Sequence, residues 1–190
     1  MRSELQRNPR VQSTRDRILT AARELLAETG PAGLTYSLLA DRAGVTRQTL
    51  YRHWPARSGL LVDLILEGSN GGYQEPGADP AVVAAEWLAS LGAGMRDPAR
   101  RAAVLAVTAQ ADTDPDSAQA LAQLMADRLA AFNDLLKPSG TQVTAEAYTV
   151  LSGPVLARVF FDRAEVTDEF IASVVEHWLA AAPAAPAAPG

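Results

Sequence analysis

Residues 35–54 read TYSLLADRAGVTRQTLYRHW, and this stretch predicts two short helices joined by a tight turn. The turn falls at Ala43-Gly44-Val45, where glycine tolerates the positive φ with which a helix ends. Thr46 stands where the second helix needs an N-cap. On that helix Leu50 and Trp54 lie one turn apart and share a side, so we expect them to anchor the helix to a core.

The opposite side of the second helix is polar. Its side chains are those of Arg47, Gln48, Thr49, Tyr51, Arg52 and His53. Base edges in the major groove of DNA offer hydrogen-bond donors and acceptors that amide, hydroxyl and guanidinium groups match. The stretch therefore predicts a helix-turn-helix that reads DNA. The alternative is a small helical subdomain whose polar side is merely solvated.

The charge of the chain is distributed unevenly. The 190 residues carry a net charge of -5, but residues 1–60 hold ten Arg and five acidic residues, a balance of +5. Residues 61–190 hold seven basic and 17 acidic residues, a balance of -10. We call the basic residues 1–60 the head and the acidic residues 61–190 the body. This distribution predicts that only the head meets the phosphates of DNA.

Composition excludes several other classes. An apolar content of 48% excludes a wholly disordered chain, and the absence of cysteine excludes disulfides and thiolate metal sites. We find neither a membrane-spanning run of roughly 18 apolar residues nor a signal peptide, so we expect a soluble, cytoplasmic protein. Two distant histidines support neither a metal site nor a catalytic triad, and we expect no enzyme and no cofactor.

Helical patterns extend outward from the motif and predict an all-α fold. Ser13-x-x-Asp16 resembles a capping box for a helix over 14–28, which stops at Gly30-Pro31. A further helix carries Leu60, Leu61, Leu64 and Ile65 and ends before Gly68, and others are predicted over 80–95, 98–111, 115–136, 144–162 and 167–181. The predicted organisation is a flexible arm (1–12), a DNA-binding domain (13–68), a ligand-binding and dimerisation domain (69–181) and a disordered Ala/Pro tail (182–190).

The order of motifs over roughly residues 14–66 resembles the TetR family of transcriptional repressors. The motifs are ILTAARELLAETG at 18–30, GLT at 33–35, LADRAGVTRQTLYRHWP at 39–55, a basic residue at Arg57 and LLVDLI at 60–65. The resemblance implies an all-helical homodimer whose heads bind a near-palindromic operator and whose bodies hold a small-molecule inducer. It also implies which residues of the head contact DNA.

The contacts that the resemblance implies fall into two groups. Thr46 is expected to contact DNA, and Arg47, Gln48 and Thr49 after it are implied at base edges or in the groove. The phosphate backbone is implied to meet Thr35, Tyr36 and Ser37 at the start of the first of the two short helices, and also Tyr51, His53 and Arg57. Two of these depart from the family pattern, because Tyr36 is bulkier than the usual small residue and Arg57 replaces a more common lysine.

Bulky and adaptable residues of the body suggest an apolar inducer cavity. The candidates are Trp87, Leu91, Met95, Val107, Met125, Phe132 and Tyr148, with Thr108 as a polar group that orients the ligand. For Met125 and Phe132, which lie on one side of the long helix over 115–136, the alternative is that they are simply core. Asp112-x-Asp114-x-Asp116 opens like a calcium loop, but Pro115 intrudes, so we expect its acids to favour the N-terminus of the next helix.

The last two helices have broad apolar surfaces. Residues 150–161 are apolar nearly all round, and the helix over 167–181 carries a wide stripe. We expect an isologous four-helix dimer interface that includes Val155, Val159, Phe160, Phe170, Val174 and Trp178, unless both helices are the core of one chain. Gly153-Pro154 predicts a kink in the first of them.

These features together predict a ligand-responsive repressor that binds a palindromic operator as a dimer. An activating regulator, or a repressor with no ligand, belongs to the same class. The competing class is a small-molecule-binding helical protein, or an enzyme, with a vestigial DNA-binding head. Sequence-selective DNA binding that weakens with salt distinguishes the two classes.

Overall fold

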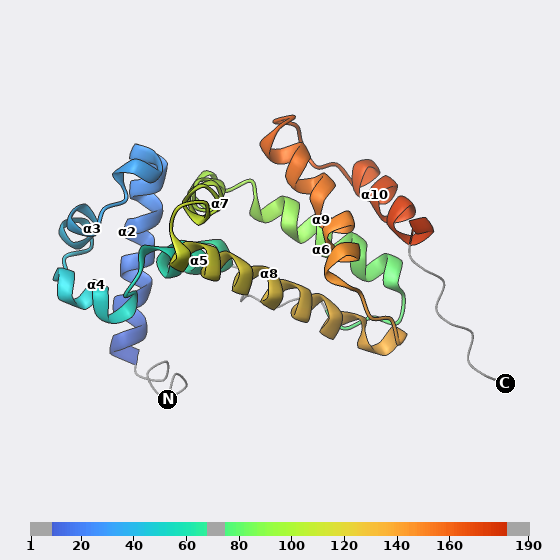
Figure 1. The fold of residues 1–190 in the computed structure, drawn as a ribbon, viewed down its shortest axis with the longest axis horizontal. Helices are drawn as coiled ribbons and strands as arrows, with labels where there is room; N and C mark the ends of the chain where they lie inside the picture. The colour runs from blue at the N-terminus through green and yellow to red at the C-terminus, as the bar shows by residue number, and fades with distance from the viewer. Residues whose placement is uncertain (1–8, 68–74, 182–190) are drawn as a thin grey trace. The chain divides into compact units, whose positions relative to one another are not determined.

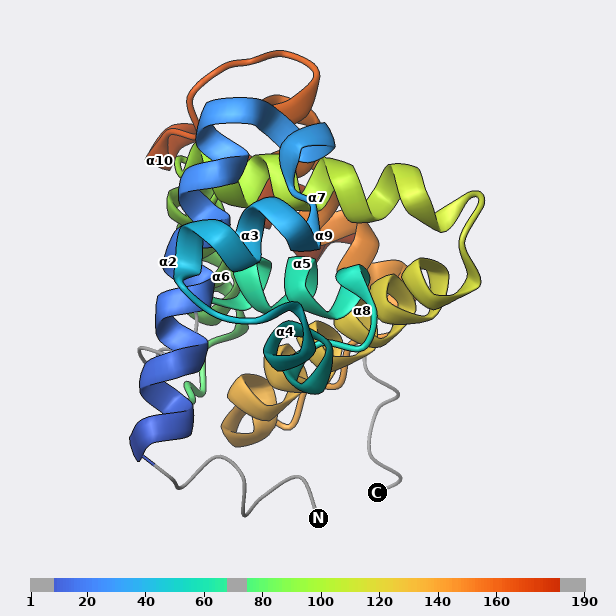
Figure 2. The same ribbon diagram turned by 90° about the vertical axis from the view of Figure 1, so that its left-hand side faces the viewer.

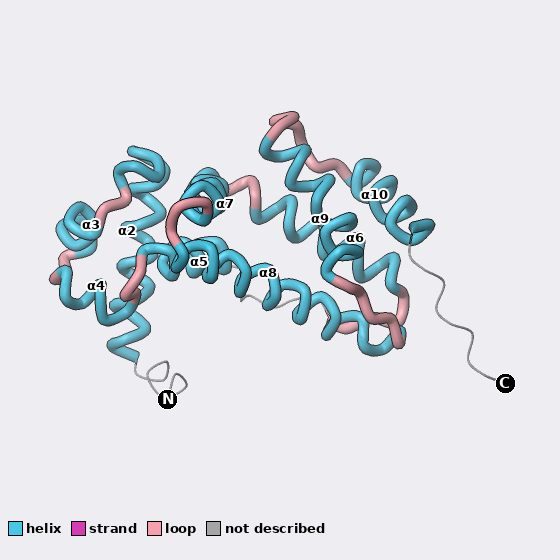
Figure 3. The backbone as a smooth tube through the Cα atoms, viewed as in Figure 1, coloured by secondary structure: helices cyan, strands magenta, loops and turns pink. Residues whose placement is uncertain are grey.

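The computed structural model describes residues 9–67 and 75–181, with the side chains of 9–12 left aside. Every regular element in these ranges is helical, which confirms the all-α prediction (Figures 1 and 3). The helices are α2 (Pro9–Gly33), α3 (Tyr36–Ala43), α4 (Arg47–His53), α5 (Arg57–Leu66), α6 (Pro80–Gly94), α7 (Pro98–Ala111), α8 (Pro115–Leu136), α9 (Ala145–Phe160) and α10 (Asp168–Ala181), with a short 3-10 helix η2 (Lys137–Ser139) after α8.

The chain packs as two compact units. Unit 1 is Met1–Gly71 with Arg96–Leu124, and unit 2 is Gly72–Met95 with Met125–Gly190. Packing therefore assigns α7 and the first part of α8 to the same unit as the helix-turn-helix, whereas the sequence-based division ran between residues 68 and 69. The reason is that small apolar residues of α7, such as Ala103 and Val107, are buried in the core of unit 1.

The first helix begins earlier than the sequence pattern predicted. Helix α2 starts at Pro9, so Ser13 lies inside the helix and the predicted capping box at Ser13-x-x-Asp16 is wrong. The predicted arm is likewise helical from residue 9, and residues 1–8 of that arm lie outside the described residues, as does the tail over 182–190. The predicted stop is confirmed, because Gly30 leaves the helical conformation with φ 68° ahead of Pro31.

The ends of the two short helices follow the predicted chemistry. Thr35 caps α3 by accepting a hydrogen bond from the Leu38 amide at 3.3 Å, and Gly44 ends α3 with φ 63°. Thr46 caps α4, since its hydroxyl accepts from the Thr49 amide at 3.2 Å. Local backbone chemistry therefore fixes the turn between α3 and α4.

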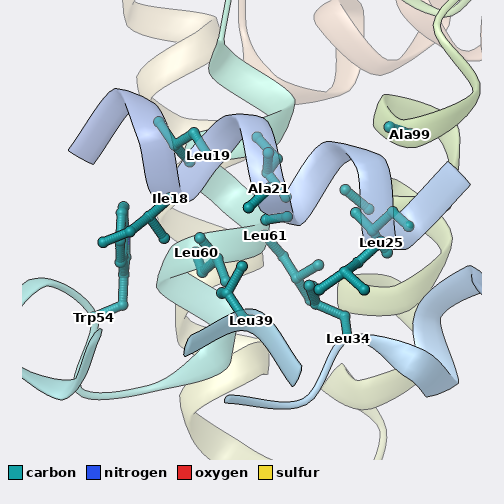
Figure 4. Close-up of a cluster of buried hydrophobic side chains, with 14 of the residues drawn as sticks. Ile18, Leu19, Ala21, Leu25, Leu34, Leu39, Trp54, Leu60, Leu61 and Ala99 are labelled. Carbon is teal, nitrogen blue, oxygen red and sulfur yellow. The ribbon is translucent and has the colours of Figure 1, made fainter. Parts of the chain in front are cut away.

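The core of unit 1 holds α4 in one rotational orientation. Figure 4 shows side chains from α2, α3, α5 and α7 directed toward one another, among them Ile18, Leu39 and Leu60. Leu50 and Trp54 are buried in the same cluster, which confirms them as anchors of α4. With these two side chains fixed inward, the polar side of α4 must face outward.

Polar contacts surround Trp54 and join α4 to its neighbours. The Trp54 Nε1–H donates to an oxygen of Asp63 on α5 at 2.5 Å. The same carboxylate pairs with Arg15 of α2 at 2.7 Å, and the guanidinium lies 5.8 Å from the centre of the Trp54 ring. Further along α2, Arg23 pairs with Glu67 at 2.7 Å and with Asp97 ahead of α7.

The core of unit 2 is built around four aromatic rings. Phe132 of α8 lies 5.3 Å from Trp87 of α6, 5.7 Å from Tyr148 of α9 and 6.2 Å from Trp178 of α10, between ring centres. The polar atoms of the cluster are paired. Trp87 donates through Nε1 to the Tyr148 hydroxyl at 3.2 Å, and Trp178 donates to the Ala147 carbonyl at 3.0 Å.

Two further expectations concern helix ends and interruptions. Asp114 caps α8 by accepting from the Ser117 amide at 3.1 Å and from its hydroxyl, and the hydroxyl bond lowers the pKa of Asp114. This confirms the expectation for Asp114, and Asp116 lies in the first turn of α8, whereas Asp112 is the C-cap of α7. Helix α9 continues through Pro154 as one element, and the kink expected there stays a prediction.

None of the helices described is both long enough and apolar enough to cross a membrane. Over the same residues, no three or more His, Asp or Glu side chains are grouped so that they could hold a metal ion.

Candidate nucleic-acid interface

The exposed side of α4 presents the polar groups that the sequence singled out. Arg47 and Gln48 are exposed at the start of the helix, and Tyr51 is 55% exposed one turn later. In Figure 2 helix α4 lies in the foreground, with α3 beside it. A guanidinium, an amide and a phenol on one open surface match the donors and acceptors of a major groove and its phosphates.

The two threonines at the start of α4 are bonded to each other. The hydroxyls of Thr46 and Thr49 are 3.0 Å apart, while Thr46 also caps the helix. This arrangement holds the Thr49 hydroxyl in place beside Arg47 and Gln48. The structure therefore gives Thr46 a capping role in the free protein, and its predicted contact with DNA stays a prediction.

The start of α3 contains both exposed and braced side chains. Thr35 and Ser37 are exposed, as a contact with a phosphate requires. Tyr36 between them is half-buried, and its hydroxyl donates to the Trp54 carbonyl at 2.7 Å. Burial raises the pKa of Tyr36 to about 12, so this hydroxyl stays protonated and available as a donor.

Two other predicted phosphate contacts are engaged within unit 1. Arg57 donates through Nη2 to the Pro31 carbonyl at 2.6 Å, and burial lowers the pKa of its guanidinium. His53 is half-buried against Trp54, with ring centres 5.5 Å apart. Burial, followed by the positive charges of Arg52 and Arg15, lowers the pKa of His53, which favours the neutral imidazole.

Sequence reasoning missed that Arg15 and Asp63 contact Trp54 and so hold the end of α4. The two residues are 48 positions apart in sequence, so no local spacing joins them. One signal was available, because Asp63 is the lone charge in the apolar run LLVDLI. A carboxylate in such a run needs a partner, and the indole N–H of Trp54 and the guanidinium of Arg15 supply it.

The candidate ligand residues do not all come together. Trp87, Phe132 and Tyr148 meet in the core of unit 2, and Leu91 packs against the same cluster. Met95, the C-cap of α6, is buried but does not belong to that cluster. The other candidates behave differently. Val107 is buried in the core of unit 1, and Thr108 and Met125 are exposed. A cation also covers the aromatic cluster, because the Arg128 guanidinium lies 4.4 Å from the centre of the Trp87 ring.

The candidate interface residues also separate into two groups. Val155 and Trp178 are buried in the core of unit 2 within one chain, as the alternative to a dimer interface expected. The remaining candidates, Val159, Phe160, Phe170 and Val174, are partly buried. Three further apolar residues of the stretches noted in the sequence, outside the list of candidates, are exposed: Val150, Leu179 and Phe161, the last 83% exposed.

Replacing Gly44 by alanine is expected to lower the free energy of unfolding by about 1–2 kcal/mol, because a side chain at φ 63° is strained. A Cβ at this position meets no atom within 4 Å, so the cost comes from the backbone alone. Urea denaturation measures it. Gly59→Ala is the matched control, because Gly59 lies inside helix α5 and a Cβ there would make an ordinary contact with the Trp54 side chain at 3.6 Å. The control should be neutral or stabilising by up to about 1 kcal/mol. Equal effects of both changes would contradict the assignment.

Comparison with known proteins finds related sequences along most of the chain. Residues 18–64 match the family described as "Bacterial regulatory proteins, tetR family". Residues 84–178, half of the chain, match "Tetracyclin repressor-like, C-terminal domain". YdeS, an uncharacterised HTH-type transcriptional regulator of Bacillus subtilis (strain 168), is 36% identical over 58 residues, which span 30% of this chain and 29% of that relative.

Solved structures with the same fold cover nearly the whole chain. The TetR family transcription regulator SCO0332 is 27% identical, with a TM-score of 0.68 over 90% of this chain and 99% of the other. GusR of Salmonella enterica is 24% identical, with a TM-score of 0.63 over 92% of this chain and 97% of the other. The likeness therefore includes the helix-turn-helix and the helices that follow it.

Proposed function

Because this chain belongs to the TetR family of bacterial transcription regulators, we propose that it is a repressor that binds a palindromic operator as a homodimer. A small-molecule inducer releases it. The observation that carries the proposal is the exposed polar side of α4, with Arg47, Gln48 and Tyr51 held outward by the buried anchors Leu50 and Trp54. The protein acts in this proposal by binding and not by catalysis.

The charge of the head supports the proposed contact with DNA. Residues 1–60 carry a balance of +5 within a chain whose net charge is -5. Arg47, Gln48 and Thr49 read base edges, while Thr35, Ser37 and Tyr51 contact phosphates. In a homodimer the two α4 helices must lie about 34–36 Å apart, one turn of DNA, to enter successive major grooves.

Apolar side chains of α9 and α10 support the proposed dimer. Val159, Phe160, Phe170 and Val174 are only partly covered within one chain, and Phe161, next to Phe160, and Val150, nearer the start of α9, are exposed. Burying these side chains against a second copy removes apolar surface from water. The same surface on both chains makes a symmetric interface.

The aromatic cluster of unit 2 supports a binding region for an apolar inducer around Trp87 and Tyr148. A ligand can bind more tightly to a conformation in which the two DNA-binding heads of the dimer are spaced differently. Such a ligand lowers operator affinity by an amount set by the difference in its affinity for the two conformations. The coupling expected of such a regulator is about 1–3 kcal/mol.

Binding to DNA from upstream of the protein's own gene tests the proposal. The purified protein should protect a short palindrome in a footprinting assay, with an affinity that falls steeply as salt rises. Because log affinity falls by about 0.9 per neutralised phosphate for each tenfold rise in salt, about six contacts predict a loss of at least 10³-fold between 50 and 200 mM.

A control separates specific binding from general attraction of charge. The same fragment with the palindrome scrambled should bind at least about 10³-fold more weakly at equal salt. Weak binding that is equal for both fragments would contradict the proposal. The competing class, a small-molecule-binding helical protein with a vestigial head, would then be favoured.

A further inference from the structure

The geometry points to Tyr36 as a positioning residue for DNA binding, which fixes the C-terminal end of α4 and the side chain of Tyr51. The inference rests on the proposed function, because Tyr51 matters only if α4 meets DNA. Tyr36 itself is half-buried and keeps its hydroxyl inside unit 1, so it acts through its neighbours.

The hydroxyl of Tyr36 ties the first residue of α3 to the last turn of α4. It donates to the carbonyl of Trp54 at 2.7 Å, across 18 positions of sequence. Trp54 is the C-cap of α4, and its own amide donates to the Leu50 carbonyl at 2.8 Å. The carbonyls in the last turn of a helix have no partner within the helix, so Tyr36 supplies one from outside.

The ring of Tyr36 meets the ring of Tyr51 edge to face. The ring centres are 4.8 Å apart and the planes are inclined by 62°, an arrangement that aromatic pairs favour. Tyr51 is 55% exposed, and this contact lies on its covered side. A side chain already held in place loses less conformational entropy when it contacts a phosphate.

The core of unit 1 does not account for the tyrosine. The inward side of α3 is formed by Leu39, Ala40 and Ala43, which are all buried, while Tyr36 only packs against the edge of that cluster. The two functions of Tyr36 are therefore chemically separable. The hydroxyl holds the end of α4, and the ring holds Tyr51.

A double-mutant cycle with Tyr51 tests the inference. Operator affinity is measured by fluorescence anisotropy on the fragment protected in the footprinting assay, with wild type, Tyr36→Phe, Tyr36→Leu, Tyr51→Leu and the double variant Tyr36→Leu/Tyr51→Leu. In the wild-type background Tyr36→Leu should weaken binding by about fivefold to tenfold, since it removes the ring contact in both subunits. Tyr36→Phe keeps the ring and should weaken binding less.

The expected result is that the effects of the substitutions at Tyr36 and Tyr51 on operator affinity are coupled, so that they do not add. In the Tyr51→Leu background, Tyr36→Leu should weaken binding no more than Tyr36→Phe does in the wild-type background, because with Tyr51 gone only the hydroxyl bond to Trp54 remains to be lost. The control is Ile65→Val in α5, a buried change that lowers the free energy of unfolding and leaves Tyr36, Trp54 and Tyr51 in place. It should leave operator affinity unchanged at a temperature where every variant is folded.

The failures of the inference and of the proposed function are distinguishable. If wild type protects no sequence, the proposed function fails and the inference fails with it. If wild type binds but Tyr36→Leu weakens binding equally with and without the Tyr51 side chain, Tyr36 is only structural. A Tyr36→Leu variant with unchanged operator affinity would also overturn the inference.

Discussion

Changing Arg47 to alanine is expected to weaken operator binding by roughly 100-fold or more. Arg47 is the first residue of α4 and is exposed, so its guanidinium is free to enter the groove. A bidentate contact from arginine to guanine contributes about 1–3 kcal/mol of discrimination, and a homodimer loses two of them. Fluorescence anisotropy with the protected operator fragment measures the change.

Two control variants show whether the effect comes from the shape of the side chain or from its charge. Arg47→Lys keeps the charge but loses the planar fork, so it should keep the salt dependence while losing much of the preference for the palindrome. Arg163→Ala removes the same charge from unit 2 and should leave operator affinity nearly unchanged. Wild-type affinity in Arg47→Ala would remove Arg47 from the interface.

Changing Phe132 to alanine is expected to lower the free energy of unfolding by about 3–5 kcal/mol. Phe132 is 0% exposed and lies among Trp87, Tyr148 and Trp178, so alanine leaves a cavity that four helices would have to close. Urea denaturation followed by circular dichroism measures the loss in unit 2. A loss of this size removes a large part of the stability of an ordinary domain.

The matched control removes the same side chain from an exposed position. Phe161 is 83% exposed, so Phe161→Ala should change the free energy of unfolding by less than about 0.5 kcal/mol within one chain. Measuring both variants at several protein concentrations separates this effect from any contribution of Phe161 to a dimer. Similar losses for the two variants would contradict the assignment of Phe132 to the core.

The elements predicted best from sequence are those fixed by neighbouring residues. Gly44 ends α3 with positive φ, and Thr46 caps α4 through an amide three residues away. Both interactions are complete within a few residues, so a single sequence contains all the information they need. The same locality explains why the bounds of α7 and α8 agree with prediction, each opened by a proline at its first position.

Interactions between distant residues were not predictable in the same way. Tyr36 and Arg57 were assigned to phosphates, but their partners are the carbonyls of Trp54 and Pro31, which only the folded chain brings near. Val107 was likewise a candidate for an inducer cavity, but it is buried in the core of unit 1, and the sequence did not indicate which helices cover it. Burial follows from periodicity, whereas the identity of the neighbour depends on tertiary packing.

The capping box at residues 13–16 failed for a different reason. The motif requires only two residues at a fixed spacing, so it also occurs by chance inside a helix. The chain continues as helix from Pro9, and Ser13 therefore has helical neighbours on both sides. A short motif was correct at Thr46, where a glycine turn precedes it, and wrong at Ser13, where no such turn does.

The packing of α7 with α5 restricts how regulators of this kind can exchange parts. Residues 96–124 follow the first body helix in the chain, yet Ala99 and Val107 fill the same core as Leu60 and Leu61. A recombination that joins a foreign body at residue 68 would leave those leucines facing side chains that did not evolve with them. A chimera of this chain is therefore expected to keep the core of unit 1 only when α7 is retained together with α2–α5, so the part that must be kept together is discontinuous in the sequence.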